Sequence, residues 1–207
     1  DYNPSSVLFG LEKNLSNIIK LHKISRLPKV LMLSGDKGIG KFTLIYHFLV
    51  NHFDKNNYDL NKFKIGENSS FTKQFLNNIF SNIIYVRGSN LKIEEIRSLK
   101  STILKTTIAE KDRFIIFDDI ELLSISCCNA LLKIIEEPSA NNYFILINNK
   151  KKKIIETIHS RSIEFKISLN NKKRVDTIKS LIKKYNLDNI IIDYDISNMS
   201  PGNFLKF

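Results

Sequence analysis

The glycine-rich turn at residues 35–41 constrains the fold more than any other segment, because of what stands on either side of it. Before it, Val30–Ser34 reads VLMLS, a short continuous apolar run that predicts a buried central strand. After it, residues 42–53 form an apolar run that predicts a helix. A strand, a glycine turn and a helix in this order predict an α/β fold with a parallel sheet.

Within this turn, Gly35, four residues, Gly40 and Lys41 have the spacing of a phosphate-binding loop, or P-loop. Such a loop curls so that backbone N–H groups face a phosphate, and we expect Gly38 and Gly40 to adopt conformations closed to larger residues. Lys41 would reach the terminal phosphates of ATP or ADP, and the helix start supplies a favourable dipole. The candidate nucleotide-binding residues are Gly35, Asp36, Lys37, Gly38, Ile39, Gly40, Lys41, Phe42 and Thr43.

The residue after the lysine departs from the P-loop pattern. Phe42 stands where a Ser or Thr hydroxyl would bind magnesium. Thr43 does not simply replace that hydroxyl, because one residue along a helix is a rotation of about 100°. We therefore expect no full magnesium-dependent hydrolysis and leave open whether ATP or ADP binds; a coincidental glycine-rich turn is the alternative.

A second apolar run, Phe114–Phe117, predicts another buried strand and is followed by Asp118 and Asp119. In an active P-loop ATPase, an acidic residue here holds the metal through water, and a following glutamate polarises the attacking water. Asp119 is one methylene shorter than that glutamate. A catalytic role for Asp119 and a capping or solvated aspartate at a strand end are both left open.

Strand-like and helical segments alternate to about residue 168, as in βα units around a parallel sheet. Beyond residue 170, short helical pieces with polar joints predict a small lid. We expect a nucleotide-binding domain at 1–168 and a helical lid at 169–207. Further expected elements are strands at 82–88, 143–149 and 164–169, an amphipathic helix at 90–108, a helix that ends before Pro138, and a surface excursion at 54–70.

Composition narrows the class of protein. The net charge of +11 favours a polyanionic partner such as nucleic acid, and Lys150–Lys153 and Lys172–Arg174 could contact its phosphates, although part of the lysine excess is typical of AT-rich coding. The adjacent Cys127 and Cys128 suit neither a disulfide framework nor a zinc site. Without a long apolar run or a basic, apolar N-terminal start, we expect no membrane span and a cytoplasmic location.

Four segments in a fixed order resemble the clamp-loader subunits of bacterial DNA polymerase III, which are AAA+ proteins. They read GDKGIGKFTL, IIFDDIELLSISCCNALLKIIEEP, FILINN and TIHSRS, and NALLKIIEEP is the most specific. The resemblance covers residues 7–207. It implies that 35–41 is a Walker A motif and that Asp118 and Asp119 form Walker B. It further implies that Asn148 and Asn149 end the sensor 1 strand, with Asn148 at the sensor 1 position. It also implies that Arg161, in Ser-Arg-Ser, is an arginine finger supplied in trans to a neighbour's ATP.

The departures from the family's catalytic pattern favour the delta-prime type of subunit. Phe42, Asp119, the lack of zinc cysteines and MSPGNF at the sensor 2 position all differ from the gamma or tau type. The resemblance then implies little ATPase activity, no zinc, and partners that are gamma/tau and delta subunits, primer-template DNA and, indirectly, the sliding clamp. An active gamma/tau-type ATPase and a basic DNA-binding module are the alternatives.

Overall fold

A computed structural model of the chain describes residues 4–77, 79–104, 112–187 and 199–205. The chain divides into two compact units, each built from segments that are distant in the sequence. The first unit comprises Asp1–Ser25, Gly35–Leu76 and Ile167–Phe207, and the second comprises Arg26–Ser34 and Asn77–Lys166. The expected domain boundary between residues 168 and 169 stays a prediction.

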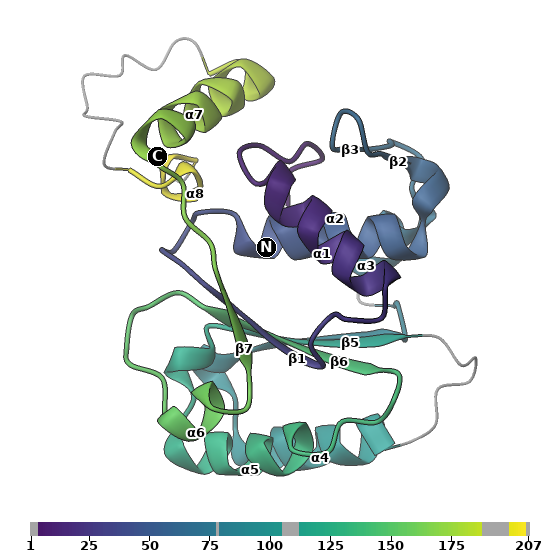
Figure 1. Ribbon diagram of the computed structural model, residues 1–207, viewed down its shortest axis with the longest axis vertical. Helices are drawn as coiled ribbons and strands as arrows, with labels where there is room; N and C mark the ends of the chain where they lie inside the picture. The colour runs from purple at the N-terminus through teal and green to yellow at the C-terminus, as the bar shows by residue number, and fades with distance from the viewer. Residues whose placement is uncertain (1–3, 78, 105–111, 188–198, 206–207) are drawn as a thin grey trace. The chain divides into compact units, whose positions relative to one another are not determined.

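The second unit contains a parallel sheet, which confirms the predicted fold class (Figure 1). Among the described residues the sheet has five strands, in the order β4-β5-β6-β1-β7. All four neighbouring pairs are parallel. The strands are β1 (Val30–Ser34), β4 (Ile83–Arg87), β5 (Arg113–Asp118), β6 (Asn142–Asn148) and β7 (Ile163–Lys166).

The apolar runs of the sequence become the strands in the middle of this sheet. Every residue of β1, β5 and β6 is buried, as expected for the strands of a parallel sheet. The helices α4 (Ile93–Leu104), α5 (Ile125–Ile135) and α6 (Glu156–His159) lie along one face of the sheet (Figure 1). Side chains from these helices and from the strands form one hydrophobic core.

The two ends of α5 follow from the local sequence. Ser124 caps α5, because its side-chain oxygen accepts a hydrogen bond from the backbone N–H of Cys127 at 3.2 Å. The helix ends before Pro138, as predicted. The predicted continuation of α4 to residue 108 lies outside the described residues. Two short 3₁₀ turns, η2 (Gly88–Asn90) and η3 (Ile120–Leu122), follow the ends of β4 and β5.

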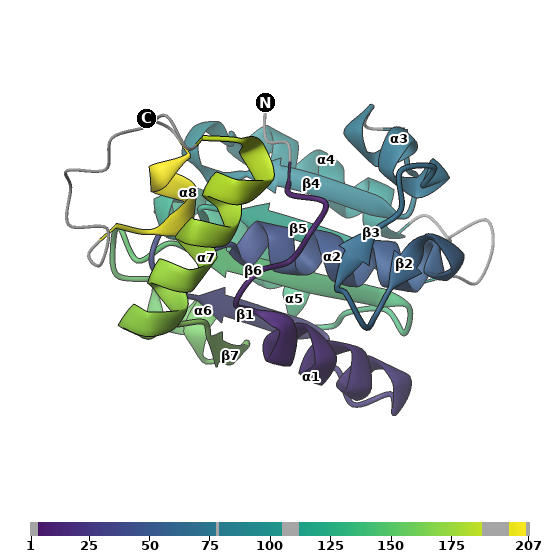
Figure 2. The same cartoon turned by 90° about the horizontal axis from the view of Figure 1, so that it is seen from above.

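The first unit is helical, and Figure 2 shows its elements from above. Helix α2 begins at the end of the phosphate-binding turn and contacts α1 and α3. The expected surface excursion contains a short antiparallel hairpin that is anchored by buried Tyr58 and Ile65. Up to residue 76, the elements of the first unit are α1 (Glu12–Lys23), α2 (Lys41–Phe53), η1 (Lys55–Asn57), β2 (Tyr58–Asp59), β3 (Lys64–Ile65) and α3 (Ser70–Leu76).

Helices also form beyond residue 170, as the sequence predicts. Helix α7 (Asn171–Tyr185) is capped by the Asn170 side chain, which accepts a hydrogen bond from the Lys173 N–H. Helix α8 (Pro201–Phe204) contacts α7, and residues 188–198 of the expected lid lie outside the described part of the chain. Within the described ranges, no helix combines the length and apolar character needed to cross a bilayer.

Candidate functional site

Polar residues gather where the parallel strands of the second unit end. Strand β1 ends at Ser34, β5 at Asp118 and β6 at Asn148. In open parallel sheets, ligands bind outside the carboxyl ends of the strands. The predicted acidic pair and the predicted sensor 1 residue are therefore at the edge of the sheet that the fold favours for a ligand.

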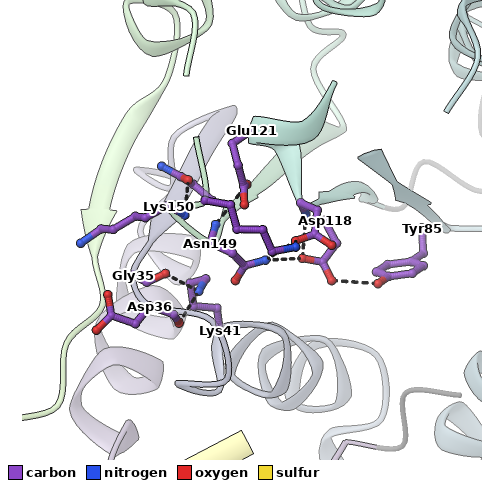
Figure 3. Close-up of polar contacts among 11 residues, drawn as sticks. Gly35, Asp36, Lys41, Tyr85, Asp118, Glu121, Asn149 and Lys150 are labelled. Carbon is purple, nitrogen blue, oxygen red and sulfur yellow. Dashed lines mark hydrogen bonds and ion pairs between the residues drawn. The ribbon is translucent and has the colours of Figure 1, made fainter. Parts of the chain in front are cut away.

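The glycine-rich turn at residues 35–41, in the first unit, has the predicted backbone shape. Gly38 and Gly40 have φ angles of +82° and +98°, which confirms that both positions require glycine. The Lys41 side chain is 3% exposed. Its Nζ donates hydrogen bonds to the carbonyl oxygens of Gly35 at 2.7 Å and Asp36 at 2.9 Å (Figure 3). The lysine expected to contact phosphate thus binds the carbonyls of its own loop.

Helix α8 lies directly on this turn. The backbone N–H of Gly202 donates a hydrogen bond to the Gly38 carbonyl at 2.7 Å. Beside this contact is a cavity of about 160 Å³, whose lining includes Leu11, Thr43 and Tyr185. Small-molecule pockets are typically about 300–1,000 Å³. This cavity is smaller than that range, and Asp36 and Lys37 on the same turn are exposed.

Phe42 lies in an aromatic environment, which is not that of a magnesium ligand. The side chain is 6% exposed, and its ring centroid lies 6.3 Å from that of Phe75. We call the group Phe42, Tyr46, Phe71 and Phe75 the aromatic cluster, because Tyr46 and Phe71 also contact Phe75 with centroid distances of 5.2 and 5.7 Å. The glycine positions of the turn have the backbone of a phosphate-binding loop, but Lys41 binds the carbonyls of its own loop and Phe42 offers no hydroxyl to a metal.

Asp118 is buried in the second unit and makes hydrogen bonds through both carboxylate oxygens (Figure 3). Oδ2 accepts from the Tyr85 hydroxyl at 3.0 Å, and Oδ1 accepts from the Asp119 N–H at 2.9 Å. Burial, together with the nearby Asp118 carboxylate, raises the pKa of Tyr85. The phenol therefore remains protonated at neutral pH and holds the carboxylate in place.

Asp119 forms an ion pair with a lysine of its own chain. Its backbone is left-handed, with φ of 53°. Oδ1 contacts the Lys151 ammonium at 2.8 Å and accepts a hydrogen bond from Asn149 Nδ2 at 2.9 Å. The ammonium supplies at Asp119 the positive charge that a metal ion would otherwise supply. This carboxylate oxygen therefore suits a role in a structural network better than the polarisation of water.

Asn148 and Asn149 have different surroundings at the end of β6. The Asn148 amide donates to the Ser34 hydroxyl at 3.1 Å, and its oxygen accepts from the Lys150 N–H at 2.8 Å. Asn148 therefore ties β6 to β1. The contacts to the acidic pair come from Asn149, whose N–H also donates to buried Glu121 at 3.1 Å.

Arg161 follows α6 and lies at the surface, with 39% of its side chain exposed. Its Nε and Nη2 atoms each lie 3.0 Å from one carboxylate oxygen of Glu136, and Nη1 donates to the Thr157 carbonyl at 3.2 Å. Ile158, in the preceding helix turn, is fully buried in the core. The predicted finger is thus an exposed guanidinium on a firmly anchored base.

Comparison with known proteins gives consistent results. A sequence profile described as DNA polymerase III, delta subunit, matches residues 10–173. The chain is 27% identical to the DNA polymerase III subunit delta' of Buchnera aphidicola subsp. Schizaphis graminum, over 95% of this chain and 61% of that protein. It is 30% identical to subunit gamma of the same organism, over 83% of this chain and 46% of that protein. The chain therefore spans about half to three-fifths of these relatives.

Solved structures agree at the level of the fold. A gamma subunit-related protein of Thermotoga maritima matches with a TM-score of 0.54 and 18% identity, over 85% of this chain and 53% of that one. The RuvB protein of the same organism matches with a TM-score of 0.51 and 17% identity, over 85% of this chain and 50% of that one. Together they confirm the expected AAA+ P-loop fold.

Proposed function

Because the chain belongs to the DNA polymerase III, delta subunit family, we propose that it is a delta-prime-like subunit of a loader that places the sliding clamp on primed DNA. In this proposal the chain supports ATP turnover by gamma/tau neighbours and performs little itself. The delta subunit is its other expected partner in the complex, and the cytoplasm is its expected location.

The observation that carries the proposal is the presentation of Arg161. The guanidinium is exposed, yet a carboxylate and a backbone carbonyl fix its orientation. A guanidinium so placed suits the charge that develops on a phosphoryl group bound by an adjacent subunit. Arg161 would thus act in trans, without any nucleotide being turned over by its own subunit.

The chain's own phosphate-binding turn supports the second half of the proposal. Phe42 belongs to the aromatic cluster, and Asp119 is paired with Lys151. Neither group is arranged to organise magnesium or an attacking water. ATP or ADP binding without turnover remains compatible with the turn, since Gly38 and Gly40 keep the positive φ angles of a phosphate-binding loop. Calorimetric titration with ATP should then give the same affinity with and without magnesium.

Reconstitution of the complete loader tests the role of Arg161. We expect Arg161→Ala in the full-length protein to lower ATP turnover by the catalytic neighbours, by about 10³-fold or more at the site it serves. Arg97→Ala is the matched control, because Arg97 is an exposed arginine on α4 of the same unit. Turnover that is unchanged by Arg161→Ala would contradict the finger.

Primer-template DNA is the proposed polyanionic partner. Lys150–Lys153 are exposed on the loop after β6, and Lys172 and Lys173 are exposed at the start of α7. Lysines in such positions contact backbone phosphates without reading sequence. We expect DNA binding that weakens steeply as salt rises, and Lys152→Ala with Lys153→Ala to reduce the salt dependence. A binding constant independent of salt would argue against phosphate contacts.

A further inference from the structure

The ion pair of Arg161 raises the question of what Glu136 does at the end of α5. Glu136 is the cap residue of that helix, and Glu137 follows it. The carboxyl-terminal end of a helix carries partial negative charge and favours cations, so two carboxylates there oppose the local electrostatics. The stability of α5 therefore gives no reason for an acid at position 136.

Arg161, in contrast, is in a favourable place even without Glu136. It follows the end of α6, where a cation complements the helix dipole, and its Nη1 donates to the Thr157 carbonyl of that helix. The pair is also half exposed, with 39% of the Arg161 and 47% of the Glu136 side chain accessible. Exposed pairs add little to stability. Glu136 instead fixes the orientation of the Arg161 guanidinium.

The atoms in contact define this orientation. Glu136 meets the Nε and Nη2 edge of the guanidinium through one carboxylate oxygen. A guanidinium has five N–H donors in a rigid planar fork. With its side edge turned to Glu136, the end edge formed by Nη1 and Nη2 points away from the carboxylate. Nη1 and Nη2 each carry two N–H donors, so each has one beyond its contact with Thr157 or Glu136, and these two donors can make a two-point contact with a phosphate.

The two residues are carried on one rigid base. Leu131 and Ile135 of α5 and Ile158 of α6 are all buried in the same core, with at most 2% exposed. The backbone positions of Glu136 and Arg161 are thus fixed by packing, and only their side chains need to be aligned.

We propose that Glu136 is the positioning residue of the Arg161 finger, holding one edge of the guanidinium so that the other faces the triphosphate of the neighbouring subunit. The proposal rests on the finger role given above. The relevant reaction remains ATP hydrolysis by that neighbour, and Glu136 contacts no reacting atom.

The test uses the full-length protein assembled with its catalytic partners. We expect Glu136→Gln to lower kcat for ATP about tenfold and to leave KM unchanged, because misplacing a positioned group weakens the transition state more than the bound substrate. Glu136→Asp should recover part of the loss. Glu137→Gln, the same change one residue later, should match the parent protein. Thermal unfolding of each assembly checks that the fold is intact.

A double variant separates positioning from a structural role. If Glu136 acts through Arg161, Glu136→Gln should cause no further loss in an Arg161→Ala background. A further loss there overturns the proposal, as does parental turnover by Glu136→Gln in a loader that Arg161→Ala impairs. In the last case the finger survives and only its positioning fails. No effect of Arg161→Ala removes both.

Discussion

Lys41 and Arg161 are the two cations expected to act on the phosphates of a nucleotide, and the chain holds them in opposite ways. Lys41 is 3% exposed and donates to carbonyls of its own turn. Arg161 is exposed and is oriented at the surface. The first cation is used within the chain, and the second is available to another molecule. A nucleotide-type loop can therefore keep its backbone shape while its lysine makes contacts only within the chain.

The largest expected effect on stability is that of replacing Phe42. If this residue is part of the interior, Phe42→Ser should lower the free energy of unfolding by about 3–5 kcal/mol, the usual cost of removing a buried phenyl ring. Urea unfolding measures the loss. Thr43→Ser, at the next position, is the control, because Thr43 lies outside the aromatic cluster. A Phe42→Ser protein as stable as its parent would show that position 42 is available for a metal-binding hydroxyl.

A buried histidine of α2 predicts that the stability of the protein depends on pH. His47 is fully buried between the Tyr58 hydroxyl at 2.8 Å and the Ser5 carbonyl at 2.9 Å, and burial lowers its pKa from 6.5 to about 4. The unfolded chain therefore binds the additional proton more readily, so stability should fall as pH drops from about 6.5 to about 4, by about 3 kcal/mol in total.

Urea unfolding across this pH range measures the effect of His47. His47→Gln should flatten the slope, whereas replacing the exposed His159 with Gln should leave it in place. An unchanged slope in His47→Gln would show that other groups cause the pH dependence.

The contact of α8 with the glycine-rich turn can be tested at Gly202. A Cβ atom at Gly202 would lie 2.8 Å from the Gly38 carbonyl oxygen, closer than van der Waals contact allows. We expect Gly202→Ala to cost about 1–3 kcal/mol of stability and to speed hydrogen exchange at the residue 202 amide. Lys37→Ala, on the exposed part of the turn, should do neither. Slow exchange retained in Gly202→Ala would mean that α8 does not depend on this contact.

The smallest effect is expected at Lys151. Its ammonium is 33% exposed, and Asn149 also donates to Asp119, so Lys151→Ala should change the free energy of unfolding by less than about 1 kcal/mol. Chemical denaturation of this variant beside Lys152→Ala measures the difference. A loss of several kcal/mol would mean that Asp119 needs this cation to remain folded.

The sequence predicts the centre of the fold well, because continuous apolar runs such as Val30–Ser34 and Phe114–Phe117 leave few alternatives to buried strands. The turn between β1 and α2 is equally determined, since its glycine spacing demands an unusual backbone. The three-dimensional roles of Arg161 and the phosphate-binding residues in catalysis stay predictions.

The partners of the predicted residues were beyond sequence reasoning. Tyr85 reaches Asp118 because β4 lies beside β5 in register, a pairing that nothing local specifies. Asn149, and not Asn148, contacts the acidic pair, because successive residues of an extended chain point in opposite directions. Glu136 meets Arg161 only once α5 and α6 share a core. For Asn149 the available signals were a polar residue directly after a buried strand and the resemblance at FILINN.

The position of β1 in the sheet has a consequence for how the chain is made. Its neighbours are β6 and β7, and the partner of Val30 is Phe144, so translation must proceed far beyond the phosphate-binding turn before β1 can pair. At about 5–20 residues per second, that wait is on the order of ten seconds on the ribosome. During it the nascent chain presents VLMLS unpaired, and this segment is where we expect chaperones to bind first.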